Sequence, residues 1–171
     1  MNYTLTNVAM TNVAMTQGDA IVGIGDAITI KFQSGIVADT LLYGSIRISK
    51  WKNNQVSLPL PLPPPTQAVV TGFEDSKYYT LGIGHIINKN ASVSITLAND
   101  PKTSTGNVSE LSPTGDTRSI SIGTKIRIND SMKLSIGGTY ARISDVTTGV
   151  YNATLNNSSI TSFGAKINYT F

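Results

Sequence analysis

The sequence predicts an all-β fold, an antiparallel transmembrane β-barrel segment of about seven strands connected as a meander. Three observations support this class. Apolar and polar residues alternate in segment after segment, the connections alternate between short and long, and charged residues stay out of the middle of the apolar rows. A transmembrane barrel requires this combination, because each strand faces lipid on one side and a wet interior on the other, with short turns at one membrane surface and longer loops at the other.

The closing strand shows the alternation most clearly. Its apolar row consists of Phe163, Ala165, Ile167, Tyr169 and Phe171, and its other row is small and polar: Gly164, Lys166, Asn168 and Thr170. Successive side chains of a strand point to opposite faces, so this strand has one apolar and one polar face.

The same period predicts the remaining strands. They are expected at residues 28–33, 40–51, 77–87, 90–98, 117–128, 131–143 and 160–171. Tight turns are expected at 88–90 and 129–131, and a short connection at 34–39. Long connections are expected at 52–76, 100–115 and 145–158.

The domain organisation follows from these strands. Residues 26–171 are expected to form the barrel portion, and residues 1–25 an N-terminal surface segment with at most a weak strand near 3–10. The connection 52–76 is rich in proline, which cannot donate a ladder hydrogen bond, so we expect a polyproline-like surface loop there with no interior strand.

Composition argues against several functional classes. A formal net charge of +3, without a basic patch interleaved with aromatic residues, gives no reason to expect a nucleic-acid partner. The chain has no cysteine and one histidine, His85, with no cluster of carboxylates around it, so neither a metal site nor a nucleophile with its base is predicted. We therefore expect no enzyme and no cofactor. Neither a secretory leader nor a helix-length apolar run is visible.

Several segments, taken in order, carry a family resemblance. They are residues 30–47 followed by Trp51, residues 79–84, 101–103, 111–114, the turn at 129–130 and the strand 164–171. This series resembles the outer-membrane long-chain fatty-acid transporters of the FadL/TodX type. The resemblance covers residues 26–171 and implies the C-terminal half of a fourteen-stranded barrel with an N-terminal plug.

The resemblance also implies a function and partners. The function is passive transport of long-chain fatty acids or other hydrophobic small molecules across the bacterial outer membrane. The expected partners are outer-membrane lipid and lipopolysaccharide, the hydrophobic substrate and the barrel-assembly machinery. For that machinery, Tyr169 and Phe171 would form the C-terminal assembly signal.

Two sets of basic residues are candidate sites. On the polar, lumen-facing parity, Arg47, Lys125, Arg127 and Lys166 are candidates for attracting a substrate carboxylate, together with Lys31 on the same parity. Structural pairing with acids elsewhere is the alternative. On the apolar parity at the outer strand ends lie Lys50, Lys77, Arg118 and Arg142. They are expected to form a rim touching lipopolysaccharide phosphates, or else to reach solvent by extending along the surface.

Two further alternatives remain open from the sequence. The chain could be a non-transporting all-β surface protein with a structural or adhesive role, which predicts a sealed apolar core. Seven strands also cannot close a wide barrel alone, so the chain is expected either to be part of a longer gene product or to pair with a second copy.

Overall fold

The computed structural model describes residues 2–10, 16–60, 66–69, 71, 73–101, 115–149 and 151–170. The secondary structure within these ranges is entirely β. No helix in the described part is long and apolar enough to cross a membrane.

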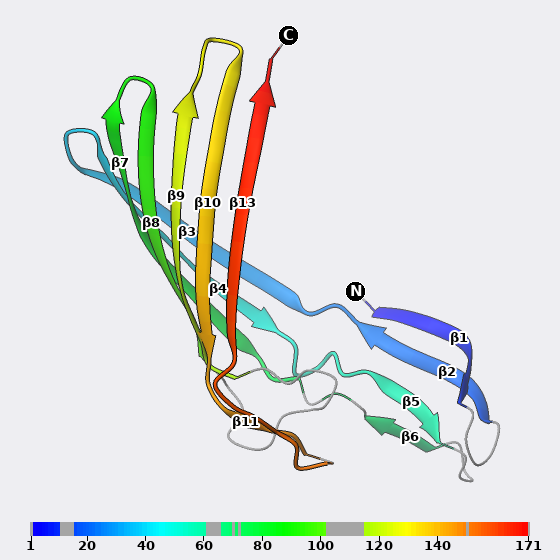
Figure 1. The fold of residues 1–171 in the computed structure, drawn as a ribbon. Helices are drawn as coiled ribbons and strands as arrows, with labels where there is room; N and C mark the ends of the chain where they lie inside the picture. Colours follow the sequence, from blue (N-terminus) through cyan, green and yellow to red (C-terminus); the bar gives the residue numbers. More distant parts are fainter. Residues whose placement is uncertain are drawn as a thin grey trace.

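A twisted antiparallel sheet of seven strands dominates the molecule (Figure 1). Its strands are β3 (Asp26–Val37), β4 (Thr40–Lys50), β7 (Ser76–Asn88), β8 (Ala91–Asp100), β9 (Thr117–Arg127), β10 (Met132–Ile143) and β13 (Ser159–Tyr169). Each pairs with its neighbours in this list, so the sheet is a meander with β3 and β13 at its edges. The predicted fold class is therefore confirmed. In the described part of the chain the sheet is open, not closed into a ring.

Short and long connections lie at opposite ends of this sheet. Figure 1 shows the turns β3–β4, β7–β8 and β9–β10 at the same end as the C-terminus. The β3–β4 turn is built differently from the other two. Asp39 has a left-handed φ of 58°, while Asn88 and Asn129 accept backbone hydrogen bonds through their side-chain oxygens from Asn90 and Ser131, respectively. The predicted alternation of connection lengths is confirmed.

The register places the apolar residues of neighbouring strands on one face, called the apolar face below. Ile28 is opposite Ile48, Ile83 opposite Ile95, and Leu134 opposite both Ile126 and Ile167. These side chains are largely uncovered.

Among the exposed large apolar side chains of this face, exposure ranges from 36% for Ile126 to 87% for Phe163, while Ile48 and Leu134 are half-buried. Ala141 and Val146 are the only buried apolar side chains among the residues whose burial the structure describes. A water-soluble domain buries such residues. The seven-stranded sheet thus has no sealed apolar core, contrary to what the surface-protein alternative predicts.

Aromatic rings cover two glycines on the apolar face. Phe32 lies opposite Gly44 and Phe163 opposite Gly138. A Cβ atom on Gly138 would lie 3.1 Å from the Phe163 ring, so each ring occupies the space that its glycine leaves empty. β3 was expected to end at residue 33 but continues to Val37 through a bulge, and this extension places Phe32 in mid-strand.

Hydroxyl groups connect strands across the opposite face, called the polar face below. Ser45 and Thr80 are 2.8 Å apart at their oxygens, as are Ser121 and Thr139. Tyr43 on β4 reaches beyond the neighbouring strand β7. Its ring lies over Gly82 on β7, and its hydroxyl is 2.7 Å from Thr96 Oγ1 on β8. One side chain thus joins three strands.

Smaller sheets lie at the long-connection end (Figure 1). β1 (Asn2–Met10), β2 (Thr16–Gly23), β5 (Ser57–Leu60) and β6 (Thr66–Val69) form a second sheet in that order, and β11 (Val146–Thr147) pairs with β12 (Thr154–Leu155). Residues 1–25 therefore contain two strands, where the sequence suggested at most a weak one.

The expectation that no interior strand crosses the proline-rich connection was wrong. β5 lies between β2 and β6 and includes Pro59, which is opposite Gln67 on β6. The described pairing of β5 with β2 is confined to Ser57 opposite Ile21, so Pro59 disrupts no ladder on that side. Residues 61–65, with the other prolines of this run, and most of the predicted loop at 100–115 lie outside the described residues.

The Tyr43 bridge predicts different outcomes at two glycines of β7. In Gly82→Val the new side chain would overlap the Tyr43 ring and displace its hydroxyl from Thr96. We expect a loss of about 1–3 kcal/mol in the free energy of unfolding. The matched control is Gly84→Val, on the same strand and face, where a Cβ would meet nothing nearer than 3.8 Å. Chemical denaturation of the detergent-folded protein measures both, and equal losses would contradict this account.

Candidate functional site: a glycine-lined trough

One residue from each strand of the main sheet contributes to a continuous row across the polar face. In sheet order the row is Gly35, Leu41, Gly84, Ser94, Gly123, Gly137 and Gly164, each opposite the next in register. We call this the glycine row. Five of its seven members are glycines, which have no side chain, so most of the row lies low between taller side chains, with Leu41 and Ser94 as the exceptions.

The glycine row forms the floor of a hollow, called the trough below. A cavity of about 1030 Å³ is lined by every member of the row, and a second of about 410 Å³ shares Ser94, Gly123, Gly137 and Gly164 with it. A Cβ atom built on Gly35 or Gly164 would meet no other atom within 4 Å. At these two positions packing inside the described part does not require glycine, whereas a Cβ atom on Gly137 would lie only 3.1 Å from the Ile122 carbonyl oxygen. The missing side chains leave a volume within the range of ligand-sized cavities.

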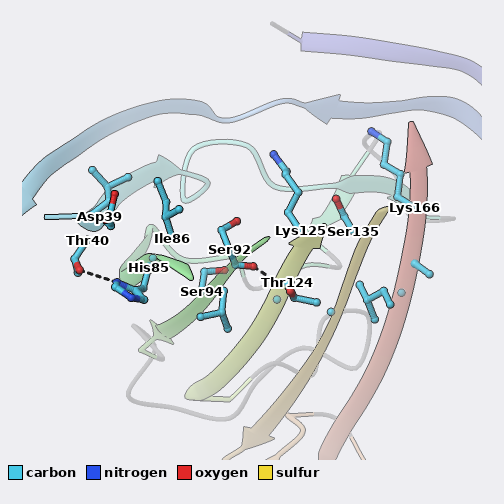
Figure 2. A pocket seen from close by; sticks show the side chains of 18 of the residues that line it. Asp39, Thr40, His85, Ile86, Ser92, Ser94, Thr124, Lys125, Ser135 and Lys166 are labelled. Atoms are coloured by element: carbon cyan, nitrogen blue, oxygen red, sulfur yellow. Dashed lines mark hydrogen bonds between the residues drawn. The ribbon is translucent and has the colours of Figure 1, made fainter. Parts of the chain in front are cut away.

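Basic side chains line the trough on its short-turn side. Lys125 and Lys166 lie on either side of Ser135 in the next row, and Figure 2 shows the two lysines extending on the same side of the sheet. In the row beyond, Arg127 is opposite Lys133. None of these four bases makes an ion pair with a residue that the structure describes. They form a positive cluster, called the lysine cluster below.

The structure separates Arg47 from the other predicted lumen residues. Arg47 is on the polar face as expected, but it lies near the long-connection end of β4, opposite Tyr78, where its Nε donates to Ser49 Oγ at 3.3 Å. Lys31 is opposite Ser45 and lies on β3, four strands away from β9, which carries Lys125. Lys125, Arg127 and Lys166 are the predicted residues brought together, and Lys133 is the member that the sequence analysis did not select.

The single histidine is part of the wall. His85 Nδ1 is 2.9 Å from Thr40 Oγ1, its cross-strand neighbour on β4, as the dashed line in Figure 2 marks. No cluster of three or more His, Asp or Glu residues suited to a metal ion occurs in the part of the chain that the structure describes.

The four predicted rim bases have unlike surroundings. All four have apolar-face positions, but Lys50 makes an ion pair of 2.7 Å with Asp75 and is also opposite Asp26 in register. Lys77 is opposite Ile48. Arg118 and Arg142 are directly opposite each other on β9 and β10.

Side-chain hydrogen bonds and a ring contact hold together the two ends of the long connection after β4, a feature that the sequence analysis missed. Gln55 donates through Nε2 to Phe73 O at 2.6 Å, while its Oε1 accepts from Phe73 N and Thr71 Oγ1, each at 3.0 Å. The Trp51 and Phe73 rings pack with centroids 6.2 Å apart. A lone glutamine in an irregular segment carries no periodic signal, so only the folded chain reveals this role.

The predicted assembly signal is only half described. Tyr169 is the last residue of β13, opposite Met132 on the apolar face, with 55% of its surface exposed. Phe171 lies outside the described residues. The assembly role of both residues stays a prediction.

Comparison with solved structures places this sheet among known folds. A structure described as "Crystal structure of a Pseudomonas aeruginosa FadL homologue" matches with a TM-score of 0.66 over 88% of this chain. The fold is that of part of a FadL homologue. The sequences are 16% identical, so the likeness concerns the fold, and the chain spans 37% of the length of that FadL homologue. No family model and no curated protein matches the sequence.

The ion pair at the rim gives a pH prediction. The Lys50 ammonium and then the Lys52 backbone N–H bond the Asp75 carboxylate and hold its pKa below the ordinary 3.8. A lowered pKa means that the stabilisation is complete above the ordinary value and is lost as the pH falls through the value in the folded protein. The fluorescence of Trp51, the one tryptophan in the sequence, should therefore change only below about pH 3.8.

Two variants test the assignment to this carboxyl group. Asp75→Asn should show the acid-state fluorescence at neutral pH. Glu74→Gln, whose carboxylate is 3.9 Å from Lys52 Nζ, should keep the original transition. A transition that survives in Asp75→Asn would contradict the assignment.

Proposed function

We propose that this chain forms part of the wall of an outer-membrane barrel that passes long-chain fatty acids or other hydrophobic small molecules across the bacterial outer membrane by passive transport, without catalysing a reaction. The observation that carries the proposal is that the sheet exposes its apolar face instead of burying it. Large apolar side chains are exposed on one face, and the trough and the lysine cluster lie on the other. Such an apolar face is stable when it is in contact with lipid.

The fold comparison supports the same proposal. The matching structure is of a FadL homologue, and the sequence resemblance points to the C-terminal half of that family's barrel. The localisation, the substrate class and the assembly signal at Tyr169 and Phe171 are all part of this proposal.

The trough supplies the chemistry that an amphipathic substrate needs. The part of the glycine row nearest the lysine cluster offers a smooth floor along which an acyl chain can lie, since no side chain projects from Gly123, Gly137 or Gly164. The lysine cluster beside it offers positive charge without acid partners among the described residues. We propose that Lys125 and Lys166, with Arg127 and Lys133 behind them, attract the carboxylate head group.

A matched pair of substitutions on β7 tests the route. Gly84→Trp places an indole in the trough, whereas Ile83→Trp places one on the apolar face at the adjacent residue. In cells that depend on this protein, uptake of a radiolabelled long-chain fatty acid should fall several-fold for Gly84→Trp and stay near the starting level for Ile83→Trp. Heat-dependent gel mobility of membrane-extracted protein shows whether each variant is folded. Unchanged uptake in folded Gly84→Trp would refute transport through the trough.

The head-group assignment has its own test. Lys125→Gln/Lys166→Gln should slow uptake of a fatty acid but not of the alcohol with the same chain, because only the acid carries a carboxylate. Lys31→Gln, on the same face of β3, serves as the charge-loss control. Equal slowing of acid and alcohol would show that the lysines act on the wall and not on the head group.

A further inference from the structure

The basic rim is not uniform, and one part of it has the features of a binding site. Arg118 and Arg142 occupy directly opposing positions of β9 and β10 on the apolar face. Opposing side chains in an antiparallel pair have Cβ atoms about 5 Å apart, and like charges in that position repel each other. A bound anion would turn this repulsion into attraction.

Neither arginine is neutralised by the described protein. Both are exposed, and neither makes an ion pair or hydrogen bond with a described residue. Lys50 differs, because Asp75 already occupies its ammonium group at 2.7 Å. Lys77 is opposite Ile48 and has no second base opposite it in the described register. The surplus positive charge is therefore concentrated at the arginine pair.

An apolar groove adjoins Arg118. A hollow of about 490 Å³ is lined by Arg118, Tyr79 and Asn99, with Leu81 and Leu97 beside them. Tyr79, Asn99 and Arg118 are consecutive in register on the apolar face, and Leu81 and Leu97 lie opposite each other two residues further along β7 and β8. A ligand fitting here has an anionic group at the arginines and an apolar chain along the leucines.

The position of the two arginines along their strands indicates which kind of anion would bind them. Arg118 is the second residue of β9 and Arg142 the last but one of β10, so both lie at the long-connection end, where the apolar face stops. In the outer-membrane placement proposed above, on which this inference rests, that level is the head-group layer of the outer leaflet. Planar guanidinium groups bind phosphate through paired hydrogen bonds.

We propose that Arg118 and Arg142 together bind one phosphate group of lipopolysaccharide, with an acyl chain of the same molecule in the groove beside Leu81 and Leu97. The bound lipid joins β9 to β10 at their outer ends and removes the repulsion between the arginines. Lys50 and Lys77 are not part of the site.

The test compares two double variants with equal loss of charge. In neutral detergent, purified protein is titrated with lipopolysaccharide or with the same material after enzymatic removal of its phosphates. Binding and the temperature of the heat-dependent gel-mobility change are measured. The starting protein should bind the phosphorylated form and unfold at a higher temperature with it. Arg118→Gln/Arg142→Gln should bind roughly tenfold more weakly or worse and lose the thermal shift.

The control is Lys50→Gln/Lys77→Gln, which removes two charges from the same rim and should keep both the binding and the thermal shift. Equal weakening in the two double variants, or equal binding of dephosphorylated lipopolysaccharide, would overturn the site. This failure is separable from failure of the proposed function. The arginine variant should still transport fatty acid when folded, whereas a protein without heat-dependent mobility or uptake would refute the transporter itself.

Discussion

Backbone hydrogen bonding is the constraint on which this structure depends. In the hydrocarbon of a membrane an unpaired N–H or C=O costs several kcal/mol, so every strand needs partners on both sides. The meander provides them for five inner strands, while β3 and β13 each have one edge without a partner in the described chain. A closed wall needs strands for those edges, from elsewhere in a longer protein or from a second copy. Either source leaves the two faces as they are, because side-chain direction is set within each strand.

The period-two alternation explains why the strands were predictable. The expected segments 117–128 and 131–143 are observed as Thr117–Arg127 and Met132–Ile143, and the register keeps charged residues out of the middle of their apolar rows. The predictions failed where the period breaks. The bulge at Ile36 interrupts the alternation, so the pattern did not show that β3 continues to Val37. Pro59 led us to expect no strand in its connection, but β5 forms there because Pro59 lies outside the described pairing with β2. Both are local exceptions that periodicity alone does not encode.

Register was the larger unknown, and it decides the site. Parity placed Arg47 and Lys125 on the same face correctly, but only the pairing shows that the first lies near the long-connection end of β4 and the second beside the trough. The same holds for the rim. Lys50 and Arg118 have equal parity and similar positions along their strands, yet Lys50 is neutralised by Asp75, which comes from an irregular connection. No sequence pattern indicates that partner, because its position depends on how the connection folds.

Glycines on the two faces show how one backbone serves two surroundings. On the apolar face Gly44 and Gly138 lie under the rings of Phe32 and Phe163, so their missing side chains are replaced by neighbours and the face stays continuous for lipid. On the polar face Gly35 and Gly164 have nothing within 4 Å of a built Cβ, whereas the Tyr43 ring covers Gly82 and the Ile122 carbonyl oxygen would lie 3.1 Å from a Cβ on Gly137. Packing accounts for the covered glycines. It does not account for the open ones, whose common property is the free volume above them. A wall that only had to be stable would fill that volume with side chains, since strands lose stability at glycine. The free volume above Gly35 and Gly164 belongs to the trough, and it is the packing observation that supports the proposed transport along this face.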